Sequence, residues 1–225
     1  MTGERHLAPK RLVAVYQALY EHYGAQHWWP AETPFEVMVG AVLTQNTAWS
    51  NVERALAQLT RRVPLTAEAI LALDHEGLAE AIRPAGYFNV KARRLRAFCA
   101  AYAELGELAA LSRLDTASLR QRLLAIKGVG PETADDMLLY AFERPVFVVD
   151  AYTRRLFVRL GLLCGEEGYE TIRQGVEQAV GPDTSVLNEY HALIVRHAKD
   201  VCRTRPRCAG CCLRQACKHA PAEPG

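Results

Sequence analysis

The sequence has 225 residues, 50% hydrophobic and 23% charged, and this balance excludes a disordered tail or a fibre. No stretch reaches the roughly 18 to 20 consecutive apolar residues of a membrane-spanning helix, and the basic N-terminus lacks the apolar run of a secretion signal. We therefore expect a globular cytoplasmic protein without a membrane partner, associated with the nucleoid if the source is prokaryotic.

Helix start signals recur along the chain. TPFE at residues 33–36 is typical of a capping box with proline at the first helical position. Further starts are expected at Ser50, Thr66, Asp74 and Asn89. No segment shows sustained alternation, and residues 146–149 are the only strand-like run. The sequence therefore predicts an all-α fold.

A glycine-rich turn, KGVGP at residues 127–131, separates two predicted helices. Gly128 and Gly130 permit a tight hairpin, and Pro131 suits the first position of the next helix. Such a turn can aim backbone N–H groups at a phosphate. An ordinary turn between two helices is the alternative interpretation.

Asp150 follows the strand-like run and stands at the expected start of another helix. A capping carboxylate at a helix N-terminus stays ionised, which suits the stabilisation of a nearby cation. The simpler interpretation is that Asp150 only caps the helix.

Five of the seven cysteines fall between residues 202 and 217, in the pattern Cys202-x5-Cys208-x2-Cys211-x5-Cys217 with Cys212 as an extra. Four thiolates fit one metal centre, either zinc or an iron–sulfur cluster, and the spacing is not that of a zinc ribbon. Cys99 and Cys164 are expected to be ordinary core residues.

The net charge is only +2, but the basic residues are clustered. One cluster contains Lys91, Arg93, Arg94 and Arg96, and seven Lys or Arg residues lie between Arg196 and Lys218 against a single acid, Asp200. Two such clusters favour an anionic partner, although a solvated basic face is the alternative.

Taken together, these motifs resemble the endonuclease III family of helix-hairpin-helix DNA glycosylases. The resemblance rests on LTQNT at residues 43–47, GYFNVKA at 86–92, GVGPETA at 128–134, VD at 149–150 and the four cysteines. It covers most of the chain, and the order and spacing of the motifs make it specific.

The resemblance implies a base-excision repair enzyme with two helical domains and a DNA-binding cleft between them. A six-helix domain with the hairpin would span residues 27–141, and residues 1–26 and 142–225 would form a cluster domain. A [4Fe-4S] cluster would be bound by Cys202, Cys208, Cys211 and Cys217. The spacing after Cys202 is five residues, where well-known members have six, and this shortens only a surface loop.

The resemblance also implies roles for individual residues. Asp150 would stabilise positive charge on the sugar as the base of a flipped nucleotide departs. Gln45 would fill the gap in the duplex, and Tyr87 would wedge into the stack. The other expected DNA-binding residues are Lys91, Lys127, Gly128, Val129, Gly130, Arg154, Arg203, Arg205 and Arg207. For Tyr152 and Arg154, two interpretations stay open: they line the base pocket or contact phosphate, or they have a purely structural role. His191 is interpreted as an ordinary helix histidine.

Glu132 occupies the position at which bifunctional family members carry a lysine. A carboxylate cannot form the Schiff base through which those enzymes cleave the DNA backbone. The resemblance therefore implies a monofunctional glycosylase that uses water activated by Asp150, with Lys127 as the nearest alternative amine. Glu132 could share the pocket with Asp150 and the catalytic work, or it could simply favour the helix dipole.

The substrate class expected by default is an oxidised pyrimidine in double-stranded DNA, with single-stranded DNA as a further candidate, and the protein is expected to be a monomer. The resemblance implies other substrates as well, because mismatched uracil or thymine and alkylated purines are handled by relatives that, like this chain, lack the lysine. Three alternatives stay open: a bifunctional glycosylase/lyase with a non-standard lysine, a catalytically silent damage-binding protein, and a redox-sensing DNA-binding module.

Overall fold

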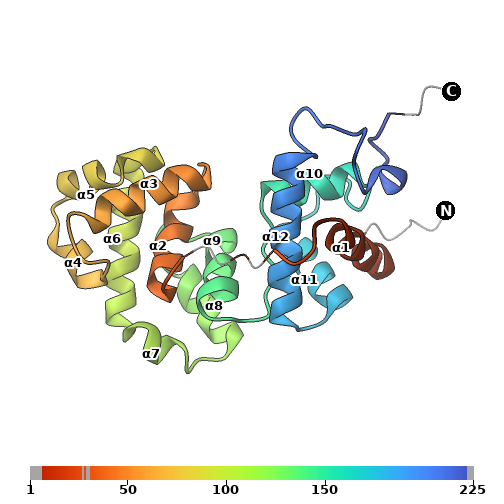
Figure 1. Cartoon of the computed structure of the whole chain (residues 1–225). Helices are drawn as coiled ribbons and strands as arrows, with labels where there is room; N and C mark the ends of the chain where they lie inside the picture. The colour runs from red at the N-terminus through yellow and green to blue at the C-terminus, as the bar shows by residue number, and fades with distance from the viewer. Residues whose placement is uncertain (1–6, 27, 29–30, 222–225) are drawn as a thin grey trace. The chain divides into compact units, whose positions relative to one another are not determined.

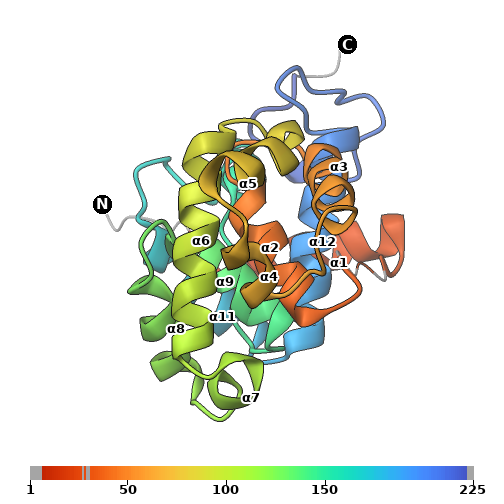
Figure 2. The same cartoon turned by 90° about the vertical axis from the view of Figure 1, so that its left-hand side faces the viewer.

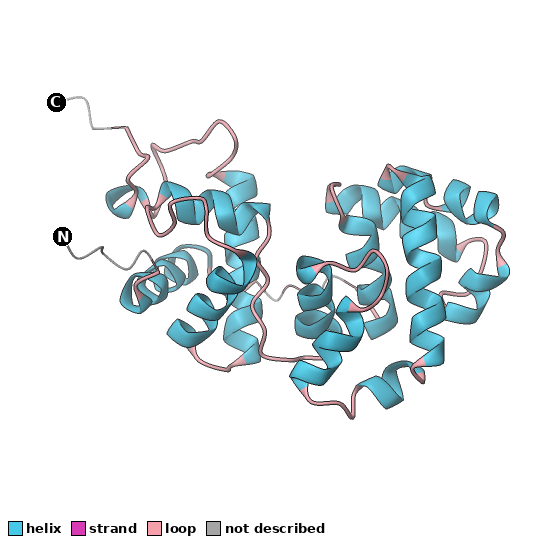
Figure 3. Ribbon diagram, turned by 180° about the vertical axis from the view of Figure 1, so that it is seen from behind, coloured by secondary structure: helices cyan, strands magenta, loops and turns pink. Residues whose placement is uncertain are grey.

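The computed structural model describes residues 7–26, 28 and 31–221 (Figure 1). In this part of the chain all regular structure is helical, and no strand is present (Figure 3). The prediction of an all-α fold is therefore confirmed. Among the described residues, no helix is long and apolar enough to cross a membrane.

The chain divides into two compact units. Unit 1 combines residues up to Trp28 with those from Pro145 onward, and unit 2 runs from residue 29 to Arg144. The domain limits expected from the sequence, 27 and 141, lie close to these divisions.

Unit 2 contains eight α-helical segments in its described part. They are α2 (Pro34–Thr44), α3 (Trp49–Thr60), α4 (Ala67–Ala72), α5 (His75–Ala81), α6 (Phe88–Glu104), α7 (Glu107–Leu111), α8 (Thr116–Leu124) and α9 (Pro131–Asp136). A short 3-10 turn, η1 (Arg83–Ala85), precedes α6, and a π-helical turn, η2 (Met137–Ala141), continues α9. Helix α6 packs against α2, α4 and α5 (Figure 2). It buries Leu95 and Phe98 in the core.

Local capping chemistry explains several helix starts. The Thr33 hydroxyl accepts the Glu36 N–H at 3.2 Å, as the capping box predicts. The Glu36 carboxylate accepts the N–H of Glu32 at 3.1 Å, one residue before the expected partner. Thr66 and Asp74 cap α4 and α5 as predicted.

Two predicted helix starts are wrong. Helix α3 begins at Trp49 with Ala48 as its N-cap, so Ser50 lies inside the first turn. The Trp49 ring packs so closely on Gly40 that a Cβ there would lie 3.0 Å from it, and this tertiary contact accompanies the earlier start. Helix α6 begins at Phe88, so Asn89 is not its cap.

Unit 1 contains α1 (Pro9–Tyr23), α10 (Ala151–Arg159), α11 (Tyr169–Val180), α12 (Thr184–Asp200) and a 3-10 turn, η3 (Arg214–Ala216). Helix α12 packs against α1, α10 and α11, and its fully buried Tyr190 donates to the carbonyl oxygen of Leu12 at 2.9 Å.

The two isolated cysteines differ in environment. Cys99 of unit 2 is fully buried, which confirms the prediction of a core residue. Cys164 of unit 1 is exposed in the loop after α10, so the same prediction is wrong there. Its backbone N–H donates to the Glu167 carboxylate at 2.8 Å, so the residue helps to form a loop and does not enter the core.

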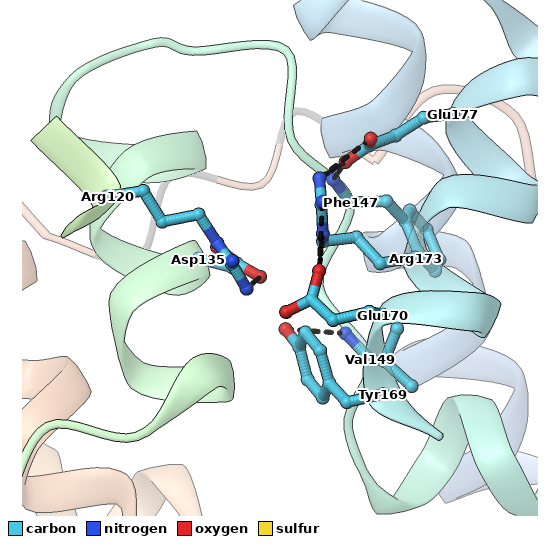
Figure 4. A network of polar contacts seen from close by, with 8 residues as sticks. All are labelled: Arg120, Asp135, Phe147, Val149, Tyr169, Glu170, Arg173 and Glu177. Carbon is cyan, nitrogen blue, oxygen red and sulfur yellow. Dashed lines mark hydrogen bonds and ion pairs between the residues drawn. The ribbon is translucent and has the colours of Figure 1, made fainter. Parts of the chain in front are cut away.

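A buried ion pair joins α8 to α9 in unit 2 (Figure 4). The Arg120 guanidinium donates two bonds to the fully buried Asp135 carboxylate, at 2.6 and 3.1 Å. Arg120→Met removes both of these bonds from a buried carboxylate, so we expect the free energy of unfolding to fall by about 3 to 5 kcal/mol. Urea unfolding measures the loss.

The matched control is Arg83→Met, which removes an exposed pair with Glu80. This variant should lose less than about 1 kcal/mol. Equal losses in the two variants would show that the buried pair has no special role in holding the helices on either side of the hairpin.

Candidate functional site

An extended segment, residues 146–149, leads to Asp150 in unit 1 and is fixed by side chains of α11 (Figure 4). The Phe147 N–H donates to the Glu177 carboxylate at 2.9 Å, and the Val149 N–H donates to the Tyr169 hydroxyl at 3.4 Å. The Arg173 guanidinium in turn donates to the Glu177 carboxylate at 2.7 Å. These α11 bonds take the place of a neighbouring strand, so the strand-like run does not form a sheet.

Asp150 is the N-cap of α10, as the sequence predicts. One carboxylate oxygen accepts the Thr153 N–H at 2.7 Å, and the other lies 3.6 Å from His191 Nε2 of α12. The Asp150 side chain keeps 14% of its surface exposed. Burial raises the pKa of Asp150, but His191 and the bonds at Thr153 outweigh burial, so the pKa lies below the ordinary 3.8. A carboxylate that is ionised, nearly enclosed and still reachable suits the stabilisation of a cation.

His191 is a site residue that sequence analysis missed. It is buried, and the centre of its ring is 5.8 Å from that of Trp28 and 6.3 Å from that of Phe147. Its role as the partner of Asp150 could not be read from the helix that carries it, because the two residues are 41 positions apart in the sequence.

We expect His191→Phe to raise the pKa of Asp150 by about 1 pH unit or more, because the favourable interaction disappears while burial remains. A lowered carboxyl pKa stabilises the fold above the unfolded-state pKa, and this contribution is lost as pH falls through the folded-state pKa. Acid unfolding of the variant should therefore begin at a higher pH. A carboxyl NMR titration of Asp150 measures the change directly.

The control is His191→Gln, which keeps a donor without the charge and should give an intermediate pKa. An Asp150 titration that is identical in all three proteins would contradict the role given to His191.

The hairpin of unit 2 is a tight turn with Gly128 at its centre. Gly128 has φ +95°, and a Cβ there would lie 2.5 Å from Cγ of Arg94. Within the described part of the chain, the N–H groups of Gly128 and Gly130 donate to no acceptor, so they can donate to a phosphate oxygen. The Val129 N–H instead donates to the carbonyl of Ile126 at 3.0 Å, and the Val129 side chain is buried. In this structure Val129 therefore supports the turn, which does not match its predicted role as a DNA contact.

Gln45 links the end of α2 to this hairpin. Its amide nitrogen donates to the carbonyl of Gly128 and to the hydroxyl of Thr133, both at 3.0 Å. Arg94 donates to its amide oxygen. The amide that is expected to fill a gap in DNA is thus held by the protein in this structure, and it must exchange these partners to reach a duplex.

Tyr87 presents its ring to solvent. It is the N-cap of α6 with φ 46° and ψ 33°, the left-handed region, and its side chain is 73% exposed. A bulky residue with this backbone conformation is strained, and such strain persists where the surrounding structure fixes it. The exposed ring is consistent with the wedge that the resemblance implies.

Lys91 does not match its predicted role as a DNA contact. It is only 2% exposed, and its ammonium donates to the carbonyls of Leu43 at 2.9 Å and Ala85 at 2.7 Å. The basic cluster 91–96 is therefore not a uniform surface patch, because one of its charges points into the core of unit 2.

The remaining predicted residues of this group occupy varied positions. Lys127 and Glu132 are exposed, and Glu132 lies in the first turn of α9. Arg154 is half-buried and donates to the carbonyl of Glu167 at 2.9 Å, so part of its guanidinium supports a loop. The Tyr152 ring lies against Arg155, whose guanidinium carbon is 5.2 Å from the ring centre.

The four predicted metal ligands gather at one place in unit 1. Cys202, Cys208, Cys211 and Cys217 all line one small cavity between α10, α12 and the C-terminal loop, whereas Cys212 does not line it. All four are free thiols. Among the described residues, no group of three or more His, Cys, Asp or Glu side chains could hold a single metal ion.

The cavity has supporting residues that sequence analysis missed. Arg159 of α10 donates to the Cys202 sulfur at 3.3 Å and to the carbonyl of Arg203 at 2.6 Å. The fully buried His197 has its Nε2 3.6 Å from the Cys211 sulfur. The only sequence signal for them is their closeness to the cysteine pattern. The three predicted phosphate-binding arginines of the loop are exposed: Arg203, Arg205 and Arg207.

The helices of the described residues, the glycine hairpin, the N-cap aspartate and the four cysteines around one cavity are the features that the resemblance to helix-hairpin-helix DNA glycosylases predicts. The profile of the HhH-GPD superfamily of base excision DNA repair proteins matches residues 39–182, and the chain belongs to this superfamily. The protein is accordingly a DNA-binding enzyme, a base excision repair glycosylase related to endonuclease III.

Sequence relatives cover almost the whole chain. A predicted DNA repair glycosylase of Methanocaldococcus jannaschii is 46% identical over 207 residues, which are 90% of this chain and 94% of the relative. Endonuclease III of Treponema pallidum is 31% identical over 218 residues, which are 95% of this chain and 97% of the relative.

Solved structures agree on the fold. A non-covalent complex of endonuclease III with DNA matches with a TM-score of 0.82 at 20% identity, covering 94% of this chain and 96% of that one. A 3-methyladenine DNA glycosylase of Helicobacter pylori, bound to 1,N6-ethenoadenine, matches with a TM-score of 0.71 at 28% identity, covering 88% and 98%.

Proposed function

We propose that the protein is a monofunctional glycosylase, which hydrolyses the N-glycosidic bond of a damaged nucleotide and leaves the DNA strand intact. The observation that carries this proposal is the placement of Glu132 in the first turn of α9, directly after the hairpin, where the resemblance implies a lysine in bifunctional members. A carboxylate cannot form a Schiff base with the opened sugar. Lys91 is no substitute, because its ammonium is buried and bound to two carbonyls.

The chemistry is assigned to Asp150. As the bond between C1′ and the base nitrogen breaks, its electron pair leaves with the base, and positive charge develops on the sugar. The ionised Asp150 stabilises this charge and accepts a proton from the water whose oxygen bonds to C1′. The base takes up a proton at the departing nitrogen, and Asp150 returns its proton to solvent. The products are a free base and an abasic site.

DNA binding is assigned to groups in each unit. In unit 2, the N–H groups of Gly128 and Gly130, together with the exposed Lys127, suit a phosphate, and Tyr87 and Gln45 are assigned to the duplex interior. In unit 1, the exposed arginines of the cysteine loop suit the DNA backbone. Such contacts position the enzyme and make its affinity depend strongly on salt.

We also propose that the four cysteines of the cavity hold a [4Fe-4S] cluster. The donor set of four thiols around one cavity fits this group, and Arg159 and His197 would interact with its ligands. When bound, the cluster supplies cross-links that shape the basic loop, and glycosidic hydrolysis requires no electron transfer from it.

Oxidised pyrimidines are the first substrate class to test, because relatives that are 30% and 31% identical are named endonuclease III. Alkylated purines are the second, because the Helicobacter pylori neighbour is a 3-methyladenine glycosylase at 28% identity.

The test uses a panel of duplexes, each with one lesion from these classes, a mismatched thymine or a uracil. Each reaction is divided, and half is treated with hot alkali before the strand lengths are measured. Breaks that appear only after alkali are expected, and the lesion that gives them identifies the substrate. Breaks without alkali would contradict the absence of lyase activity, and no breaks in either half would contradict a glycosylase for these lesions.

A further inference from the structure

Lys91, in the first turn of α6, is a buried cation without a counter-ion. It is 2% exposed, and within the described part of the chain no carboxylate pairs with its ammonium. Its two acceptors are main-chain carbonyls, Leu43 O at 2.9 Å and Ala85 O at 2.7 Å. They belong to different segments, the last turn of α2 and the end of η1.

Such a cation is costly to the fold. Burial, with a smaller contribution from the nearby Arg94 charge, lowers the pKa of Lys91 from 10.5 to about 8. An apolar side chain of similar length would fill the same space without desolvating a charge. Residues that break a local rule of stability are expected at functional or strained sites.

Each acceptor carbonyl lies two residues before a side chain that the proposed function assigns to the DNA duplex. Leu43 stands two residues before Gln45, and Ala85 stands two residues before Tyr87. The ammonium of Lys91 therefore ties together the two segments that carry the side chains assigned to the duplex interior.

The backbone of Lys91 also supports one of these segments. Its N–H donates to the carbonyl of Tyr87 at 3.0 Å, across a turn in which Gly86 and Tyr87 have φ of 69° and 46°. Tyr87 is a bulky residue in the left-handed region, and such a conformation needs support from its surroundings to persist. Lys91 supplies it from both its main chain and its side chain.

We propose that Lys91 is a positioning residue, which fixes the Gln45 and Tyr87 segments relative to each other so that both side chains enter the DNA duplex together. The inference rests on the proposed function, because that function places Gln45 and Tyr87 in the DNA. It differs from the role expected for Lys91 from the sequence, since the residue acts through other residues and touches no phosphate.

The experiment compares the wild-type protein with Lys91→Met, which keeps the length of the side chain and removes the charge. The probe is a duplex with a tetrahydrofuran abasic analogue opposite 2-aminopurine, and an undamaged duplex is the reference. Insertion of side chains into the stack should raise the fluorescence of 2-aminopurine. We expect Lys91→Met to lose affinity for the abasic duplex on the order of 10-fold and to lose the fluorescence rise at saturation, while binding of the undamaged duplex is unchanged.

The matched control is Ile70→Ala, which removes a fully buried side chain of α4 from the same unit, where α4 packs against α6. At a temperature where all variants are folded, this control should keep both the affinity and the fluorescence rise. A loss of the same size in Ile70→Ala would mean that Lys91 has only a general structural role, and this outcome overturns the proposal.

A double-mutant comparison adds a second test, which also serves if Lys91→Met folds poorly. Lys91→Arg keeps the charge and should recover part of the fluorescence rise. Combined with Tyr87→Ala, either Lys91 variant should add little to the loss caused by Tyr87→Ala alone, because the two residues act on the same step. Fully additive losses would overturn the proposal. A wild-type protein that does not prefer abasic to undamaged DNA would instead count against the proposed function.

Discussion

Asp150→Asn is expected to reduce base release by about 10²- to 10⁴-fold while the protein stays folded and binds DNA. Asparagine is a good N-cap, so the bond from the Thr153 N–H and the start of α10 should be kept. What is lost is the negative charge, which stabilises the sugar cation and accepts the proton from water. The measurement is single-turnover release of the base from the lesion duplex that wild-type protein processes best.

A control for the cap is Asp150→Ser, which also caps a helix but leaves no carboxamide in the site. Both variants should show a reduction of base release in this range and should have thermal stabilities close to each other. Base release by Asp150→Asn at a rate within a few-fold of wild type would contradict the assignment of the chemistry to this residue.

Cys208→Ser is expected to cause the second large effect, the loss of the cluster and of much of the DNA affinity. A missing thiolate leaves the cluster incompletely held, and the loop that carries Arg203, Arg205 and Arg207 loses its cross-links. If all three arginines lose their contacts with DNA phosphates, the slope of log affinity against log salt concentration should become shallower by up to about 3. Iron and sulfide analysis of the purified protein, followed by binding at several salt concentrations, measures both changes.

The chain offers a matched control one residue away from a ligand. Cys212 is adjacent to Cys211 but does not line the cavity, so Cys212→Ser should keep full iron content, affinity and salt dependence. Equal loss of iron in the two variants would contradict the ligand set. Iron-free wild-type protein with an unchanged salt slope would contradict the role of the cluster in shaping the loop.

Features that depend on neighbouring residues in the chain could be predicted from the sequence. The Thr33, Thr66 and Asp74 caps and the Asp150 cap involve a side chain and an N–H three residues later, so they are visible as local patterns. The hairpin glycines, Gly128 and Gly130, are also visible as a local pattern between two predicted helices. These short-range signals suffice to indicate the helical fold and the position of Asp150.

Features that depend on distant residues could not be predicted in the same way. Helix α3 starts at Trp49, whose ring packs over the distant Gly40, and α6 starts after the strained Tyr87 rather than at the better capping residue Asn89. The basic residue Lys91 is buried, and its ammonium donates to a carbonyl 48 positions away in the sequence. A charge pattern gives the sign of a cluster, but it does not show which of its members faces inward.

The central claim is base removal without a covalent bond between enzyme and DNA, and borohydride trapping during turnover tests it most directly. The wild-type protein is incubated with its best lesion duplex in the presence of borohydride, and free base and protein–DNA adduct are measured in the same sample. We predict stoichiometric free base, an abasic strand of full length and no adduct. A reduced covalent adduct, above all one that maps to Lys127, would contradict the claim and establish a lyase that uses a different amine.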